Sequence, residues 1–164
     1  MIQRVQSIYL FLIVVLGILL FFVPALELVT PVEAPTQRMW ELQATGLDEV
    51  TPNLDLLMLE PIHLNGLWGL LLTTALIPVL AFVVLILFRN RILQARLNIF
   101  LAFLCVGYYG ILAMYGWFAV QNFGVEWHVT PWAAIPAVCF VLTLMATRRI
   151  LADEALVRAA DRIR

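Results

Sequence analysis

The sequence predicts an all-α integral membrane protein: a four-helix transmembrane bundle whose N- and C-termini both lie in the cytoplasm. Three observations support this fold class. First, 63% of the residues are hydrophobic and only 13% are charged, whereas soluble domains carry roughly a quarter charged residues. Second, the apolar residues gather in four runs of about membrane-spanning length. Third, nearly all arginines lie on one side of these runs, as the positive-inside rule expects of cytoplasmic segments.

The four runs predict spans over residues 8–26, 64–88, 97–120 and 130–147 of a single membrane domain, residues 1–164. The first run, as a helix, would be about 28 Å long, close to the ~30 Å of the hydrocarbon core. It also loosely fits a secretory signal peptide, since Val23-Pro24-Ala25 is similar to a small-x-small cleavage site. Because its apolar stretch exceeds the ~7–15 residues of a signal core, an uncleaved helix is the favoured interpretation.

A short basic stretch in the middle of the chain sets the orientation. Residues 89–96 hold three arginines between two apolar runs, which is the pattern of a cytoplasmic turn. Of the ten basic residues, only Arg38 falls on the opposite side, together with eight of the eleven acidic ones. Trp68, Trp117, Trp127 and Trp132 fall at the outer ends of the spans, where aromatic belts lie. The arginines that determine this topology are Arg4, Arg89, Arg91, Arg96, Arg148 and Arg149.

The first outer loop, residues 27–63, differs in composition from the rest of the chain. It holds seven of the eleven acidic residues and four prolines, and the prolines disfavour a long helix. Within it, residues 40–44 alternate apolar and polar side chains with the period of a half-buried strand. We therefore expect a small β-hairpin that lies over the outer ends of the helices.

Three spans contain residues with both a structural and a functional interpretation. Pro78 should kink the second span, and we favour a packing role over a hinge because no ionisable residue lies near it. In the third span, small residues share a helical stripe with Asn98 and Tyr109, beside Tyr108. This seam is either a helix–helix interface, which we favour, or a site for a quinone or lipid headgroup. In the fourth, Thr130-Pro131 predicts an N-cap followed by the first helical turn.

Motifs that would carry catalysis are absent from the sequence. It contains no glycine-rich phosphate loop, no HExxH and no GxSxG. No Asp, Glu, Arg, Lys or His falls inside any of the four spans, which argues against ion-coupled transport. Cys105 and Cys139 form no CxxC pair, and a net charge of −1 gives no field for nucleic acid. We expect no catalytic residue, no cofactor and no nucleic-acid partner.

The two histidines provide the one candidate metal site. His63 and His128 both fall at the outer ends of spans, each close in sequence to an acid, Glu60 or Glu126. Two histidines and two glutamates would suit a metal ion, and the histidines alone would suit haem, if the outer loops brought them together. Their spacing is loose and no local motif supports it, so we favour ordinary polar residues at a wet interface.

Residues 148–164 predict a cytoplasmic helical tail. Glu154 and Arg158 are spaced for an i,i+4 ion pair, and Leu156 shares a face with Ala160 and Ile163. Such a tail suits either the membrane surface or a protein partner. The residues expected to make this contact are Glu154, Leu156, Arg158, Asp161 and Arg162.

Three stretches of the chain carry a family resemblance: MIQRVQSIYL at residues 1–10, RNRILQAR at 89–96 and DEALVRAADRIR at 153–164. Together they resemble a family of small four-span membrane proteins from Bacteroidota that is defined only as a domain of unknown function, number 4293. The resemblance implies four helices and a location in the bacterial inner membrane. It implies no catalytic residues.

Two functions of different class are consistent with these observations. We favour a non-enzymatic accessory or scaffold subunit that acts in the lipid bilayer through other membrane proteins or further copies of itself. Its support is an acidic outer loop, a charged tail and spans without ionisable residues. The alternative is a small channel, carrier, or lipid- or quinone-binding protein that uses Tyr108, Tyr109 and the bend at Pro78.

Overall fold

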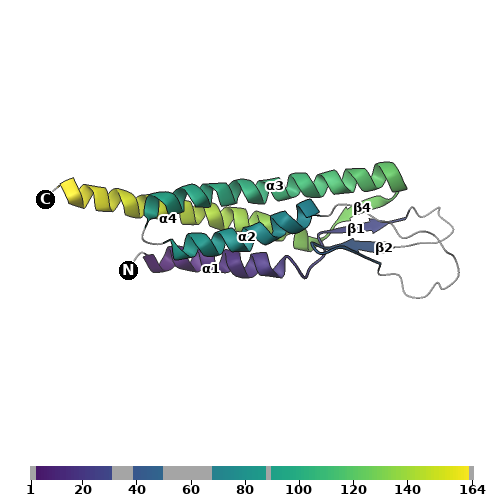
Figure 1. Cartoon of the computed structure of the whole chain (residues 1–164), viewed down its shortest axis with the longest axis horizontal. Helices are drawn as coiled ribbons and strands as arrows, with labels where there is room; N and C mark the ends of the chain where they lie inside the picture. Colours follow the sequence, from purple (N-terminus) through teal and green to yellow (C-terminus); the bar gives the residue numbers. More distant parts are fainter. Residues whose placement is uncertain (1–2, 31–38, 50–67, 88–89, 163–164) are drawn as a thin grey trace.

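The computed structural model, which describes residues 3–30, 39–49, 68–87 and 90–162, is an elongated helical bundle with a small β-sheet at one end (Figure 1). The helices are α1 (Gln3–Leu19), α2 (Trp68–Ile86), α3 (Arg91–Phe123) and α4 (Ile135–Arg162). A short 3₁₀ helix, η1 (Pro131–Ala134), leads into α4. Both termini lie at the end opposite the sheet, which we call the inner end; the sheet marks the outer end.

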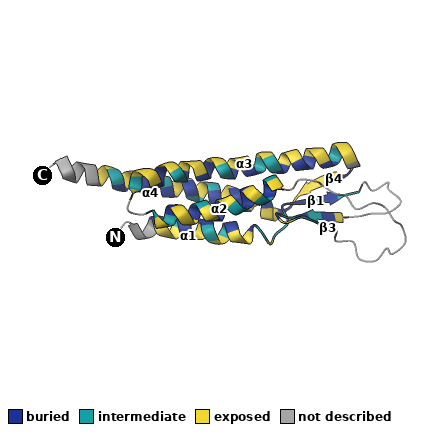
Figure 2. Ribbon diagram, viewed as in Figure 1, coloured by how far each residue is buried: buried dark blue, intermediate teal, exposed yellow. Residues whose placement is uncertain are grey.

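The helices form a closed ring in which each contacts its two neighbours. The contacts join α1 to α2, α2 to α3, α3 to α4, and α4 back to α1. Buried and exposed residues alternate along each helix (Figure 2), and many of the exposed residues are large and apolar. Phe11 and Phe103, for example, are 62% and 71% exposed. An exposed apolar surface of this extent belongs in lipid.

Three of the described helices are long and apolar enough to cross a membrane. The qualifying segments are Trp68–Ile86, Arg91–Asn122 and Pro131–Leu156. The described apolar part of α1, Gln6–Leu19, is shorter. The predicted first span, 8–26, is therefore wrong at its outer end. Helical hydrogen bonds continue only as turns to Phe22, since Pro24 disfavours helical backbone in the residue before it.

At the inner end, the helices extend beyond the predicted spans. The basic stretch 89–96 is not all turn, because α3 begins at Arg91 and carries Arg96 inside the helix. Likewise, α4 continues without a break through Arg148 and Arg149 to Arg162, so the fourth span and the tail are one helix. Arginine is a good helix former, and a change from apolar to basic residues marks the membrane surface without ending the helix.

The outer end is a four-stranded antiparallel sheet, so the all-α prediction needs correction. Its strands are β1 (Leu26–Val29), β2 (Met39–Leu42), β3 (Leu47–Glu49) and β4 (Glu126–Val129), in the order β3-β2-β1-β4. The predicted strand at residues 40–44 corresponds to β2, which forms a hairpin with β3. The sequence analysis missed β4, which comes from the second outer loop, and placed the first residue of β1 in a span.

The sheet is attached to the helices through its apolar face and through one threonine. Leu26, Leu28 and Leu42 are buried in the same core as the helix side chains. Thr130 stands at the N-cap position of η1 as predicted, but its hydroxyl makes no cap bond. It lies instead 2.5 Å from the carbonyl oxygen of Pro24 and 3.1 Å from that of Ala25. This contact joins the chain just before β1 to the start of η1.

Pro78 lies inside α2, and α2 continues on both sides of it. The hydroxyls of Thr73 and Thr74 donate to the carbonyls of Gly69 and Leu70, at 2.6 and 2.8 Å. On α1, a Cβ placed on Gly17 would lie 3.0 Å from the Cβ and Cδ atoms of Pro78. Gly17 therefore allows α1 to approach the proline ring closely, which supports the packing role of Pro78.

We predict that Gly17→Ala destabilises the bundle, because the added methyl group meets a rigid ring that cannot rotate away. Overpacking of this kind costs about 1–3 kcal/mol. Gly110→Ala is the matched control, since a Cβ there meets nothing within 4 Å. Thermal unfolding in mild detergent should show a lower midpoint for Gly17→Ala alone, and equal midpoints would contradict the close approach.

Candidate functional site

A chain of buried amides links three helices near the inner end. Gln6 of α1 donates from Nε2 to Oε1 of Gln94 on α3, at 3.1 Å. Gln94 in turn donates from Nε2 to the carbonyl oxygen of Val84 on α2, at 3.0 Å. Because a carbonyl only accepts, this second bond fixes which end of each amide faces the other. The Oε1 atom of Gln6 is then left buried with no hydrogen-bond partner among the described residues.

A second polar cluster joins α3 to α4 one turn further along. Asn98 donates from Nδ2 to the carbonyl oxygen of Thr143 at 2.8 Å and to the hydroxyl of Thr147 at 2.7 Å. The Thr147 hydroxyl itself donates to the Thr143 carbonyl at 2.9 Å. The Oδ1 atom of Asn98 is buried and has no partner within the described part of the chain. Since the three amides connect helices, the two clusters stabilise the bundle.

The tyrosine seam of α3 lies against the start of α4. The Tyr109 hydroxyl donates to the carbonyl oxygen of Ala133 at 2.6 Å and accepts from the N–H of Ala137 at 3.0 Å. Those two residues are four apart, which is the spacing of an α-helical hydrogen bond. Tyr109 therefore bridges the backbone where η1 becomes α4. Its ring stands edge-on to Tyr108, with centroids 6.0 Å apart, and Tyr108 is fully buried.

This placement engages the Tyr109 hydroxyl in a contact within the protein. One donor and one acceptor position are filled by Ala133 and Ala137, and the Tyr108 ring lies inside the core. The structure thus provides a helix–helix contact at the seam that the sequence analysis proposed as either interface or cofactor site. Cys105 and Cys139 are both free thiols buried in the same core.

Half of the candidate metal site falls outside the described residues. Glu60 and His63 belong to that undescribed part, whereas Glu126 and His128 lie on β4 with exposed side chains. No group of three or more His, Cys, Asp or Glu residues in the described part is arranged to hold a metal ion.

The sheet instead reveals a row of titratable residues that crosses all four strands. Glu27 on β1 stands directly opposite Glu41 on β2 and opposite His128 on β4. Glu41 in turn stands opposite Asp48 on β3. Directly opposed positions of an antiparallel sheet share one face, with Cβ atoms about 5 Å apart. We call Asp48, Glu41, Glu27 and His128 the acidic row.

Glu27, Glu41 and His128 of the acidic row lie on the sheet face opposite to the leucines. Side chains of a strand alternate between faces, and the neighbours of Glu27 in the chain, Leu26 and Leu28, are buried in the core. Glu27 and Glu41 are half-buried and His128 is exposed. Sequence reasoning found the acidic character of the loop but missed the row, since the row depends on the register between strands, and its His128 position depends on pairing with β4.

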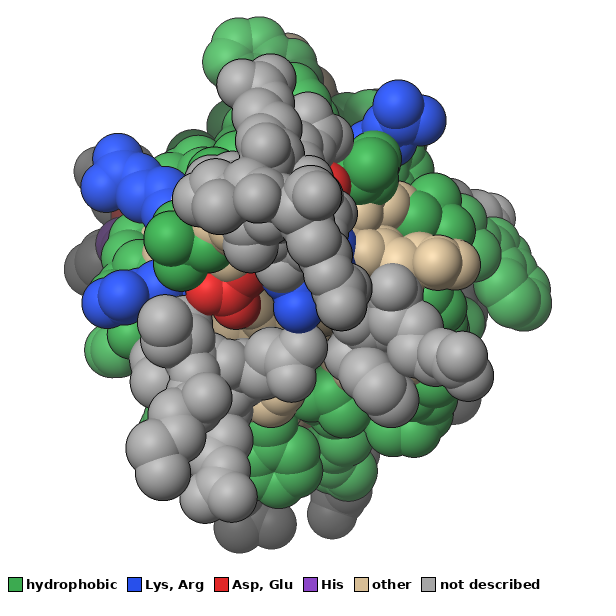
Figure 3. Space-filling view, turned by 90° about the vertical axis from the view of Figure 1, so that its left-hand side faces the viewer, with side chains coloured by type: hydrophobic (Ala, Val, Ile, Leu, Met, Phe, Trp, Pro, Cys, Tyr) green, Lys and Arg blue, Asp and Glu red, His purple; other side chains and the backbone are tan. Residues whose placement is uncertain are grey.

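The inner end gathers the described arginines (Figure 3). Arg96, Arg148 and Arg149 are exposed, and Arg91 donates from a guanidinium nitrogen to the backbone carbonyl of Asp153, at 3.2 Å. This bond ties the start of α3 to the tail part of α4. Of the remaining topology residues, Arg4 lies in α1 and Arg89 falls outside the described residues.

The predicted tail residues all lie on or beside the projecting end of α4, which extends past the other helices in Figure 1. Leu156 is 61% exposed, and Glu154 is half-buried. Arg158, Asp161 and Arg162 belong to the helix, and their side chains fall outside the described set. Ile150 and Asp153 face the bundle and are buried.

We predict that Tyr109→Phe lowers stability while it preserves the packing of the ring. The change leaves the Ala133 carbonyl and the Ala137 N–H without the hydroxyl, which costs about 1–3 kcal/mol where the groups stay shielded from water. Tyr9→Phe, the same chemical change on α1, is the control. Unfolding curves in detergent that coincide for the two variants would show that the hydroxyl bridge contributes nothing.

Comparison with known proteins shows which family the chain belongs to. No curated protein matches the chain. A family described as Domain of unknown function (DUF4293) matches residues 2–163, which is nearly the whole of the 164-residue sequence. The family resemblance seen in the sequence is thereby confirmed, and the chain belongs to the DUF4293 family.

Proposed function

We propose that this protein is a non-enzymatic scaffold or accessory subunit of a bacterial inner-membrane assembly, which acts through protein–protein contacts. In this proposal the chain crosses the membrane four times, with both termini in the cytoplasm. The arginines at the inner end support this orientation by the positive-inside rule. The position of α1, between α2 and α4 in the ring, supports a fourth span despite its shorter apolar stretch.

The acidic row is the observation that carries the proposal. Like charges placed directly opposite each other destabilise a sheet by roughly 0.2–1 kcal/mol per pair. Glu27 and Glu41 form such a pair in the middle of the sheet. A chain that keeps a destabilising pair at its outer end, on the face turned away from its own core, is suited to a partner that supplies positive charge. We therefore propose a basic segment of another protein as the outer partner.

The projecting end of α4 supports a second contact on the cytoplasmic side. The helix passes beyond its neighbours, and Leu156 is largely exposed there. An apolar side chain on a helix that leaves the bundle is a common anchor for another helix or groove. Together, the two ends would let the protein connect partners on both sides of the membrane.

The interior of the described bundle supports this role better than that of a channel or carrier. Its amides bond between helices or to the backbone, and Tyr109 bridges backbone groups. Transport proteins instead keep polar groups available along a path. A small channel, carrier, or lipid- or quinone-binding protein is the second candidate function.

We predict that the double change Glu27→Gln and Glu41→Gln separates stability from function. Removing the opposed charges should raise the free energy of unfolding by about 0.2–1 kcal/mol at neutral pH. The same change should reduce recovery of the outer partner after cross-linking in intact membranes, and high salt should weaken that contact in the unchanged protein. The measurements are unfolding in detergent and quantitative recovery of cross-linked complexes.

The control for this experiment is Glu126→Gln, since Glu126 stands opposite Val29 and has no like charge directly across from it. It should leave stability unchanged.

Leu156→Glu tests the cytoplasmic contact in the same way, because its exposed position tolerates a charge. If a lone protein is recovered in every case, with or without these changes, the scaffold proposal is wrong.

A further inference from the structure

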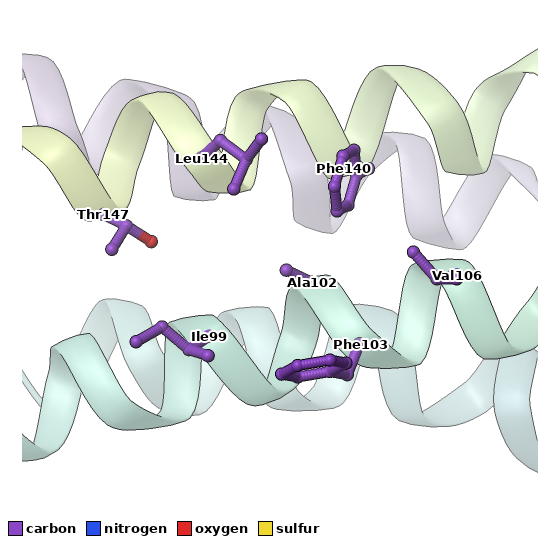
Figure 4. A pocket seen from close by; sticks show the side chains of 7 residues that line it. All are labelled: Ile99, Ala102, Phe103, Val106, Phe140, Leu144 and Thr147. Carbon is purple, nitrogen blue, oxygen red and sulfur yellow. The ribbon is translucent and has the colours of Figure 1, made fainter.

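A groove opens between α3 and α4 on the surface of the bundle. Its volume is about 340 Å³. Residues between positions 99 and 106 of α3 line one side, and residues between 140 and 147 of α4 line the other (Figure 4). Each stretch rises about 10 Å along its helix, roughly a third of the ~30 Å hydrocarbon thickness. The groove therefore has the reach of part of one acyl chain.

The lining of the groove offers almost no hydrogen-bonding group. Ile99, Phe103 and Leu144 are aliphatic or aromatic and partly exposed. The single polar side chain is Thr147. Its hydroxyl already accepts from Asn98 and donates to the Thr143 carbonyl. A molecule in this groove thus contacts hydrocarbon, and its polar part must lie outside.

Two arginines flank the inner mouth of the groove, one on each helix. Arg96 precedes Ile99 by three residues and Phe103 by seven, which places it on the same stripe of α3. Arg148 follows Leu144 by four residues and lies next to Thr147 on α4. Both side chains are exposed. Guanidinium groups bind phosphate through paired, charge-assisted hydrogen bonds.

We propose that this groove binds an anionic phospholipid, with one acyl chain between α3 and α4 and the phosphate held by Arg96 and Arg148. The apolar lining selects the chain, and the two positive charges at the membrane surface select the headgroup. Basic pockets between transmembrane helices bind acidic lipids in this way. The site is separate from the acidic row and from Leu156, and it does not depend on the scaffold proposal.

Lipid titration followed by native mass spectrometry tests the site. Purified, delipidated protein is titrated with phosphatidylglycerol and with phosphatidylcholine of the same chain length. We expect one phosphatidylglycerol per chain to bind about tenfold or more tightly than phosphatidylcholine. The double change Arg96→Gln and Arg148→Gln should abolish this preference. Arg149→Gln with Arg158→Gln removes the same charge at other positions of α4 and should retain it.

A change in the groove itself tests the acyl chain. Ala102→Leu fills the groove and should weaken phosphatidylglycerol binding about tenfold. Gly107→Leu, which adds a larger side chain where nothing lies within 4 Å, should not. In the unchanged protein, phosphatidylglycerol with a photoreactive acyl chain should label residues 99–106 or 140–147. Equal binding of the two lipids would overturn the proposal. So would labelling that is spread over all helices or absent from these stretches, and so would cross-linking of a second copy at the groove.

Discussion

The structure depends on one constraint, the need to satisfy backbone hydrogen bonds where the chain passes from the helices into the sheet. Ala25 lies at this point, between α1 and β1. Its N–H donates to the carbonyl of Leu42 at 2.9 Å, and its carbonyl accepts from the N–H of Thr130 at 3.4 Å. The strand that follows, β1, is the central partner of both β2 and β4. The end of the first helix, the outer loop and the start of α4 are thereby joined in one hydrogen-bonded unit.

This unit also explains which parts of the fold the sequence could predict. The helices were predicted because hydropathy and arginine placement are local properties of the sequence, and both depend directly on the bilayer. The alternation at residues 40–44 predicted β2 correctly, with Trp40 and Leu42 buried and Glu41 half-buried. By contrast, β4 was missed because Glu126–Val129 becomes a strand only through pairing with β1. Its burial pattern is exposed throughout, so no periodicity identified it.

The differences between the predicted spans and the observed helix ends have a related cause. Apolar composition extends past Leu19, but the backbone of Leu26 is used by the sheet. Composition changes to basic at Arg148, but nothing in the backbone there opposes a helix. Hydropathy therefore locates the membrane, whereas hydrogen bonds and proline locate the ends of elements. The site followed the same rule: the Tyr109 stripe was visible from helical spacing, and the acidic row required the register of the sheet.

The buried amides show how polar residues can serve a bundle in lipid. Gln94 and Asn98 are four apart on α3 and reach different helices, one toward α1 and α2 and the other toward α4. Without a hydrophobic drive between helices in a bilayer, such bonds and close contacts define which helices are neighbours. The amides act at the inner half of the bundle, and Gly17 acts at the contact of α1 with α2.

The continuity of α4 has a mechanical consequence. Its 28 residues form one helix, which is about 42 Å long by helical rise. At its outer end, η1 begins at Thr130, which is bonded to the chain entering β1. Because α4 is unbroken, a force applied along its axis at one end is transmitted to the other end. Tension applied along α4 at its inner tip is therefore transmitted to the strands at the outer end.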